Sequence, residues 1–338
     1  MTAMEYRRLG DSGLEVSALC LGTMMFGVRT EAADAQRIIG TAFDQGVNFV
    51  DTADAYGKGA AERIVGAAIK GQRRRWIVAS KVFNPMTERP HDGGLSRRWI
   101  MQACDDSLER LSTDWIDVYY LHRDDADTPL EETIGAIGDL IRSGKIRYFG
   151  VSNFRGWRVA EVVAECEAQG VPRPVVCQPH YNLLDRMPEM ELLPACDYYG
   201  IGVAPYSPAG RGVLTGKYRG GARPDDSRAG RNDKRMLETD FRPEALAVAE
   251  KLEAHAAKTG RTLLQFALAW LWTNRIVSSI IAGPRTLAQW NDYAGALGTK
   301  WSTEDEAAVD SLVRPGFSPT PFHVDPQYPI DGRRLENT

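Results

Sequence analysis

The chain has 338 residues, of which 43% are hydrophobic and 25% charged, and its formal net charge at pH 7 is −4. This length allows either one large α/β barrel or two average domains, and the composition is typical of a soluble globular protein. The charge balance gives no reason to expect nucleic acid as a partner, and no cationic amphipathic stretch favours a membrane surface. Residues 1–10 lack the apolar run of a signal peptide and the most apolar segment, 263–272, is too short to span a bilayer, so we expect a cytoplasmic protein.

The cysteines argue against disulfides and against zinc. There are five, at widely spaced positions and without any C-x-x-C pair. An odd number with this spacing predicts neither a disulfide framework nor a metal site. We therefore expect reduced thiols, several of them in the core.

Apolar strands and amphipathic helices alternate along almost the whole chain. The first element is an expected hairpin of 6–9 and 14–16, whose turn is Gly10-Asp11-Ser12-Gly13. The strands predicted after it are 17–21, 47–51, 76–80, 116–121, 146–151, 175–177, 201–205 and 277–282. The predicted helices include 31–45, 60–70, 96–111, 157–168, 188–199, 243–258 and 263–272, with a last one starting near Thr286.

One further helix, after the fourth strand, has the clearest boundary signals. Thr128 is placed as its N-cap, Pro129 at its first position and Glu131 three residues after the cap, which is the pattern of a capping box. Gly144 marks its end.

Strict alternation over this length predicts a (β/α)8 TIM barrel with an N-terminal β-hairpin, formed as one domain by residues 1–338. A doubly wound sheet is the competing architecture. Its dinucleotide fingerprint has only near misses, at Gly57-Lys58-Gly59 and Gly210-Arg211-Gly212, and neither lies between an early strand and its helix. The long loop after strand seven, 217–235, should lie on the catalytic face, and the tail 314–338 should cover an end of the barrel.

Four titratable residues lie at or just beyond the carboxyl ends of consecutive strands. Asp51 ends the second strand and Tyr56 follows five residues later, Lys81 ends the third strand, and His122 ends the fourth. Each alone has an ordinary structural explanation as a cap, a core aromatic, a surface charge or a satisfied histidine. Together they indicate a catalytic site, because the carboxyl ends of barrel strands meet on one face.

These four groups suit proton-coupled reduction of a carbonyl. A buried ammonium stabilises the anion of a neighbouring phenol, so we expect Lys81 to lower the pKa of Tyr56, with Asp51 keeping the lysine charged. His122 can donate a hydrogen bond to the substrate oxygen, where negative charge develops. No side chain can donate a hydride, so the electrons must come from a cofactor.

The same residues resemble the aldo-keto reductase superfamily over essentially the full length, in the branch with a long loop after strand seven that includes aldehyde reductases and potassium-channel β subunits. Asp51-Thr52-Ala53-x-x-Tyr56-Gly57, the strand-end Lys81 and Tyr120-Leu121-His122 match its Asp/Tyr/Lys/His tetrad. The resemblance implies that Tyr56 is the proton donor, that Lys81 and Asp51 tune it, and that His122 orients the carbonyl.

The resemblance also implies a set of cofactor contacts. Ser152, Asn153 and Gln178 would hold the nicotinamide amide, and Tyr206, followed by Ser207, would stack on the nicotinamide ring. The loop 217–235 would fold over the pyrophosphate and place Lys217 and Arg228 on phosphate. The remaining implied contacts are Asp51 itself, the turn Gly22-Thr23-Met24, and Gly283, Arg285, Gln289 and Asp292 for the adenosine phosphate.

Arg285 at a helix N-terminus suits a 2′-phosphate, which favours NADPH over NADH. The sequence departs from the family pattern at Tyr293, where an asparagine usually faces the adenine, and at Ala282 and Ala209. The adenine contact is therefore the part of the cofactor site that the resemblance does not specify.

The sequence therefore predicts an NADPH-dependent reductase that converts an aldehyde or ketone to the alcohol. The substrate would be a small-molecule carbonyl compound, for which a sugar-derived compound is one candidate. The alternative is a nucleotide-binding regulatory subunit that senses redox state with little turnover. Expected substrate-pocket walls are Met25, Phe26, the region of Tyr181 and, from the tail, His323 and Tyr328. No heptad pattern indicates an oligomeric state.

Overall fold

The structure, a computed structural model, describes residues 3–329. It opens with an antiparallel hairpin of β1 (Tyr6–Arg8) and β2 (Glu15–Ser17), as the sequence predicts. The side chains of Leu9 and Val16 are fully buried and belong to the apolar cluster inside the barrel. The hairpin therefore closes one end of the barrel.

Eight parallel strands form a closed barrel, which confirms the predicted fold class. The strands pair in the order β10-β3-β4-β5-β6-β7-β8-β9. A parallel bridge between Val203 and Val277 closes the ring, with Ser278 N donating to Val203 O at 2.9 Å. The strands are β3 (Leu19–Gly22), β4 (Phe49–Asp51), β5 (Ile77–Val82), β6 (Ile116–Leu121), β7 (Ile146–Ser152), β8 (Val176–Gln178), β9 (Gly202–Val203) and β10 (Ile280–Ala282).

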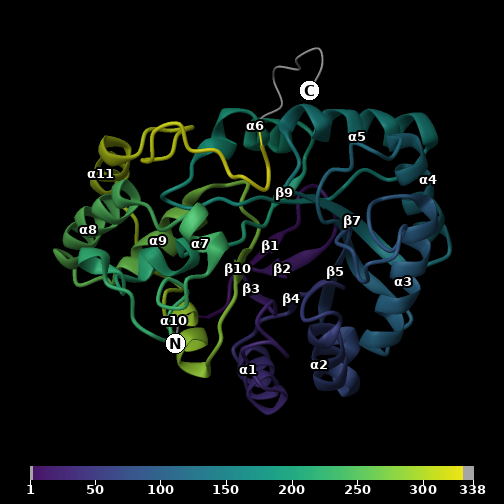
Figure 1. Ribbon diagram of the computed structural model, residues 1–338, viewed down its shortest axis with the longest axis horizontal. Coiled ribbons are helices and arrows are strands. Elements are labelled where there is room, and N and C mark those ends of the chain that lie inside the picture. Colours follow the sequence, from purple (N-terminus) through teal and green to yellow (C-terminus); the bar gives the residue numbers. More distant parts are fainter. Residues whose placement is uncertain (1–2, 330–338) are drawn as a thin grey trace.

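Helices surround the strands, which occupy the middle of the molecule (Figure 1). The apolar faces of the helices pack on the outside of the barrel in one large cluster, and a smaller cluster fills the barrel interior. The helices are α1 (Ala32–Asp44), α2 (Ala60–Ile69), α3 (Arg97–Leu111), α4 (Leu130–Arg142), α5 (Gly156–Gln169), α6 (Leu192–Tyr198), α7 (Lys234–Glu238), α8 (Pro243–Ala257), α9 (Leu263–Thr273), α10 (Leu287–Ala294) and α11 (Thr303–Leu312). No helix within residues 3–329 is both long and apolar enough to cross a membrane.

The predicted capping box of α4 is wrong. The helix begins at Leu130, its N-cap is Pro129, and no side chain caps it. The Thr128 hydroxyl instead donates to Asp125 Oδ2 at 2.8 Å. That carboxylate is largely buried and also accepts from Leu95 N at 2.7 Å. The Thr128 hydroxyl therefore bonds back to a residue three positions earlier in the chain and does not cap the helix.

The predicted helix 188–199 is broken in two. A 3₁₀ turn, Met187–Met190, precedes α6, and Glu191 between them has φ −145° and ψ −45°. The Glu191 carboxylate accepts a hydrogen bond from Trp157 N at 3.0 Å, at the start of α5. Glu191 thus provides the hydrogen-bond acceptor for a free N–H group at the start of α5, and the backbone at Glu191 departs from helical geometry.

Strand β9 is shorter than the predicted strand 201–205, and it passes very close to the N-terminal hairpin. A Cβ at Gly202 would lie 2.4 Å from Gly10 N and 2.6 Å from Ser278 Oγ. Only glycine permits this approach.

The loop after β9 and the C-terminal tail connect distant parts of the chain. The loop contains a short 3₁₀ turn, Arg219–Gly221, and its last two residues already belong to α7. The tail follows α11 and is seen in yellow in Figure 1, and Arg186 N donates to Phe317 O in it at 3.0 Å. Residues 330–338 of the predicted tail lie outside the described residues.

Candidate active site

The structure brings the four predicted catalytic side chains together at the carboxyl ends of β4, β5 and β6. Lys81 Nζ is at the centre and donates to Asp51 Oδ1 at 2.6 Å, to Thr52 O at 2.8 Å and to Tyr56 Oη at 3.1 Å. The rings of Tyr56 and His122 meet edge to face, with their centroids 6.0 Å apart. The result is a continuous chain of polar contacts from a carboxylate through an ammonium to a phenol.

The Lys81 ammonium remains charged although it is fully buried. Burial lowers the pKa of Lys81, but the Asp51 carboxylate and the Tyr56 oxygen outweigh this, so that its pKa lies above the ordinary value. A cation in this position stabilises any negative charge that develops on the Tyr56 oxygen.

Lys81 lowers the pKa of Tyr56 as predicted, but its effect does not dominate. Burial raises the pKa of Tyr56 and the Asp51 carboxylate adds to this, while Lys81 lowers it by less, so the pKa lies above its ordinary value. The sequence indicated the correct effect of Lys81 but gave no measure of burial. Tyr56 is therefore a fully protonated phenol at neutral pH in this structure.

His122 is held as a neutral ring with a defined proton position. Burial, Lys81 and Arg123 lower the pKa of His122 well below its ordinary value. Asn84 Nδ2 lies 3.0 Å from His122 Nδ1. Because an amide nitrogen only donates, Nδ1 accepts and the ring proton is on Nε2.

Sequence reasoning missed Asn84. It stands two residues beyond the end of β5, in a segment without periodicity. The one available signal is its position, because Lys81 near the end of the same strand was already a candidate.

A cavity of about 840 Å³ opens beside the tetrad and runs along the carboxyl end of the barrel. Every residue predicted to contact the cofactor lines it, as do Tyr56, His122 and Tyr293, whereas Lys81 lies buried behind. The cofactor candidates on its wall are Gly22, Thr23, Met24, Asp51, Ser152, Asn153, Gln178, Tyr206, Ser207, Lys217, Arg228, Gly283, Arg285, Gln289 and Asp292.

Amide and hydroxyl groups form the middle of the cavity wall. Gln178 Nε2 donates to Asp51 Oδ2 at 2.9 Å, and Ser152 Oγ donates to Gln178 O at 2.8 Å. Asn153 has φ 59° and its Oδ1 accepts from Tyr206 Oη at 2.8 Å. These groups are thus fixed by one another, and they link the tetrad carboxylate on β4 to β7 and β8 on the other side of the barrel.

The far end of the cavity is strongly cationic. Burial and then repulsion from three arginines lower the pKa of Lys217, which shows how crowded the positive charge is. Lys217 packs against Gly212, whose φ of 104° lies in the region that favours glycine. Besides Lys217, the cations on this part of the wall are Arg228, Arg231 and Arg285.

One carboxylate partly neutralises this end. Asp226 forms a bidentate pair with Arg285, with both N···O distances 2.8 Å, and Arg29 and Arg231 lie near it at 3.4 Å. Neither Asp226 nor Arg231 was predicted from the sequence. The donor set still contains more cations than carboxylates, so it fits the phosphates of a dinucleotide.

The predicted substrate-pocket walls are correct only in part. Met25 and Tyr328 line the main cavity. Phe26 is fully buried in the core, and Tyr181 is 2% exposed with its hydroxyl bonded to Glu189 at 2.8 Å. His323 lines a second cavity of about 490 Å³, for which Tyr328 also forms part of the wall.

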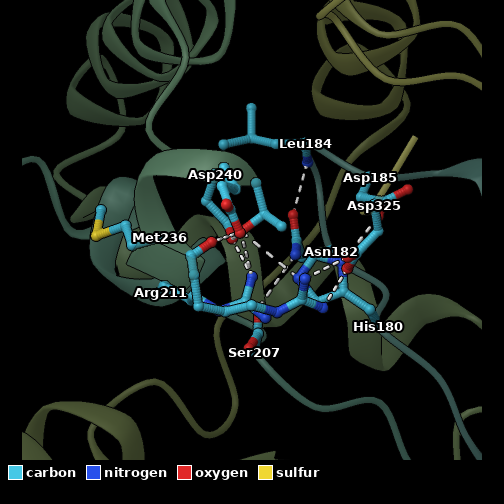
Figure 2. Close-up of polar contacts among 12 residues, drawn as sticks. His180, Asn182, Leu184, Asp185, Ser207, Arg211, Met236, Asp240 and Asp325 are labelled. Atoms are coloured by element: carbon cyan, nitrogen blue, oxygen red, sulfur yellow. Dashed lines mark hydrogen bonds and ion pairs between the residues drawn. The ribbon is translucent and has the colours of Figure 1, made fainter. Parts of the chain in front are cut away.

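His180, Asp185, Arg211 and Asp240 belong to a charged network at this end of the barrel (Figure 2). The His180 ring is 5.3 Å from the Tyr206 ring, its Nδ1 is 2.8 Å from Asp185 Oδ2, and its Nε2 is 3.5 Å from Asp240 Oδ1. Arg211 pairs with the same Asp240. Burial lowers the pKa of His180, but the two carboxylates outweigh this and raise it to about 9.

A closed α/β barrel whose carboxyl end joins the Tyr56 phenol to a long cavity with a cationic end is an architecture suited to a nicotinamide-dependent oxidoreductase. Comparison with known proteins agrees. The model of the Aldo/keto reductase family matches residues 18–314.

The relatives include both enzymes and channel subunits. An uncharacterized oxidoreductase of Bacillus subtilis, YrpG, is 41% identical over 307 residues, which are 87% of this chain and 91% of that protein. An L-glyceraldehyde 3-phosphate reductase of Escherichia coli is 34% identical over 325 residues, 93% of each chain. A probable voltage-gated potassium channel subunit beta of Arabidopsis thaliana is 40% identical over 285 residues, 83% of this chain and 87% of that protein.

The chain therefore belongs to the aldo/keto reductase family and is an NAD(P)H-dependent reductase of carbonyl groups.

Proposed function

We propose that this protein uses NADPH to reduce an aldehyde or ketone to the alcohol, with Tyr56 as the proton donor. The observation that carries the proposal is the chain of contacts from Asp51 through Lys81 to Tyr56, which meets the same cavity as the cationic cluster. When bound, the nicotinamide supplies the hydride.

Side chains of the protein bind the carbonyl, transfer the proton and stabilise the charge that results. His122 donates a hydrogen bond from its Nε2–H group to the carbonyl oxygen and so holds that oxygen beside Tyr56. As negative charge develops on that oxygen, Tyr56 transfers its proton, and Lys81 stabilises the phenolate left behind. Asp51 keeps the lysine charged, and the phenolate then regains a proton from solvent, which restores the starting state.

The preference for NADPH over NADH rests on the cationic end of the cavity. Arg285 precedes the N-terminus of α10, and its guanidinium is already in a bidentate contact with a carboxylate. A phosphate monoester presents the same fork of oxygens with more charge. Ser152, Asn153 and Gln178 would hold the amide of the nicotinamide, and Tyr206 would lie against its ring.

A regulatory, nucleotide-sensing subunit is the second candidate. It is favoured by the 40% identity with a protein described as a probable potassium channel subunit beta. The complete Asp, Tyr, Lys and His set favours turnover, since a protein that only binds nucleotide has no need of a proton donor.

The deciding experiment follows the loss of NADPH and of NADH absorbance with simple, aromatic and sugar-derived aldehydes. We expect faster turnover with NADPH, and a decrease in kcat of roughly 10²- to 10⁴-fold in Tyr56→Phe, which removes the acid. Tyr198→Phe is the matched control, because this tyrosine is 83% exposed. Tight nucleotide binding without turnover of any carbonyl would favour the regulatory subunit, and no binding of either nucleotide would refute both candidates.

A further inference from the structure

Arg123 follows His122 directly and lines the cavity next to the tetrad. It is half-buried, and its guanidinium carbon lies 4.9 Å from the Phe83 ring and 5.5 Å from the Tyr328 ring. Stacking engages the faces of a guanidinium and leaves its N–H groups, which lie in the plane, free to donate.

The acidic residues next to Arg123 in sequence form hydrogen bonds with other partners. Asp124 Oδ1 accepts from Arg158 Nε at 2.9 Å, and Asp125 Oδ2 accepts from Leu95 N at 2.7 Å. Sequence proximity therefore gives Arg123 no counterion.

Among the arginines within residues 3–329 that line the main cavity, Arg123 is the one without a carboxylate partner. The pairs made by the others are Arg211–Asp240, Arg228–Asp233, Arg231–Asp226, Arg235–Asp325 and Arg285–Asp226.

We propose that the substrate carries an anionic group, a carboxylate or a phosphate, close to its carbonyl, and that Arg123 binds this group. This rests on the proposed function. A half-buried guanidinium next to the residue that orients the carbonyl can accept two oxygens of one anion, which fixes the substrate at two points. Arg123 thereby selects an acidic carbonyl compound over a neutral one of the same shape.

The simpler explanation is that Arg123 only braces the C-terminal tail by stacking on Tyr328. The two explanations differ in what they predict. A brace affects all substrates alike, whereas a binding group changes the ratio between anionic and neutral substrates.

The test measures kcat/KM for two matched pairs of aldehydes at constant ionic strength. Glyceraldehyde 3-phosphate is compared with glyceraldehyde, and succinic semialdehyde with butanal. The wild-type protein should prefer the anionic member of at least one pair by about tenfold or more, because a charge-assisted hydrogen bond to a desolvated group has this effect on binding. If the protein prefers the anion only in the first pair, the anionic group of the substrate is a phosphate, and if only in the second pair, it is a carboxylate. A preference in both pairs indicates a site that binds either anion.

Arg123→Gln should reduce the anionic-to-neutral ratio by roughly 10- to 100-fold, and Arg123→Lys by less, because lysine keeps the charge but not the fork. Arg142→Gln is the matched control. Arg142 is 61% exposed at the C-terminal end of α4, away from the cavity, so that variant removes one charge and should keep the wild-type ratio.

A second measurement needs no variant. Inorganic phosphate and malonate should inhibit the wild-type reduction of butanal in competition with the aldehyde, and raised salt should weaken this inhibition. A wild-type ratio below about threefold in both pairs would overturn the role of Arg123, as would an unchanged ratio in Arg123→Gln. In either case the protein would still reduce butanal, and the proposed function would be unaffected. Failure to reduce any carbonyl is a different result, because it refutes the proposed function and the inference with it.

Discussion

His180 offers a quantitative test of the charged network that it forms with Asp185, Asp240 and Arg211 (Figure 2). Its imidazole is 17% exposed and lies between the carboxylates of Asp185 and Asp240, which raise its pKa to about 9. The ordinary value of histidine is 6.5. The folded state therefore holds a proton that the unfolded chain releases between these two values.

The size and sign of the effect follow from linkage. Each pKa unit corresponds to about 1.4 kcal/mol, so a rise from 6.5 to about 9 stabilises the folded protein by about 3 kcal/mol. This contribution is fully present below pH 6.5 and is lost as the pH rises through 9. A pH increase across this window should therefore decrease the free energy of unfolding.

The assay is urea unfolding of the wild-type protein and of His180→Gln at pH 6, 7, 8 and 9.5. The stability difference between them should shrink by about 3 kcal/mol over this range. Burial and repulsion by Glu62 raise the pKa of Asp54 to about 8, so its ionisation also destabilises the folded protein as the pH rises. That effect cancels in the difference, and His91→Gln provides a matched control at an exposed histidine.

An NMR titration of the ring protons gives a direct check, since the chain has only five histidines and the variant identifies the signal of His180. A midpoint at or below 6.5, or a stability difference that stays constant from pH 6 to 9.5, would refute the reasoning. Asp185→Asn should move the midpoint downward, because it removes the nearer carboxylate.

Two further predictions concern the main cavity. Asp226→Asn removes the carboxylate that competes for Arg285, so we expect NADPH to bind roughly 3- to 10-fold more tightly by nucleotide fluorescence titration, with less change for NADH; weaker NADPH binding would show instead that Asp226 holds the loop in place. Asn84→Ala leaves Nδ1 of His122 without its donor, and we expect kcat/KM to fall by roughly tenfold while the dissociation constant of NADPH, measured in the same titration, stays within twofold. An unchanged kcat/KM would mean that Asn84 does not set the orientation of the ring.

The sequence could predict the placement of Asp51, Lys81 and His122 because barrel geometry makes strand ends converge. The alternation of strands and helices fixes which residues end each strand, and these three stand at or just beyond the ends of β4, β5 and β6. Local pattern was therefore sufficient to place these three residues. The cofactor candidates at the ends of β3, β7 and β8, which are Gly22, Ser152 and Gln178, came from the resemblance to the aldo-keto reductases, and they line the cavity.

Contacts between loops could not be predicted in this way. Asp226 reaches Arg285 across 59 residues of sequence, and Asn84 reaches His122 across 38, in segments that have no periodicity to fix their direction. The hydroxyl of Thr128 is a related case, since a local rule assigned it to a helix and a buried carboxylate took it. For Asp226 and Asn84 the deciding partner comes from another part of the fold, whereas the Thr128 hydroxyl chooses between two local partners and bonds to the largely buried Asp125.

The distribution of charge along the cavity favours one direction for a bound dinucleotide. At the cationic end, burial and then repulsion from neighbouring arginines lower the pKa of Lys217, so bound phosphates would relieve repulsion there. At the tetrad end, the Asp51 carboxylate is buried and is balanced by Lys81 alone. A pyrophosphate at that end would meet the Asp51 carboxylate and the single guanidinium of Arg123, which has no carboxylate partner within residues 3–329, whereas Lys217, Arg228, Arg231 and Arg285 line the far end. Charge thus favours an orientation with the pyrophosphate under the loop 217–235 and the nicotinamide beside Tyr56, which would leave the space next to Arg123 for the substrate.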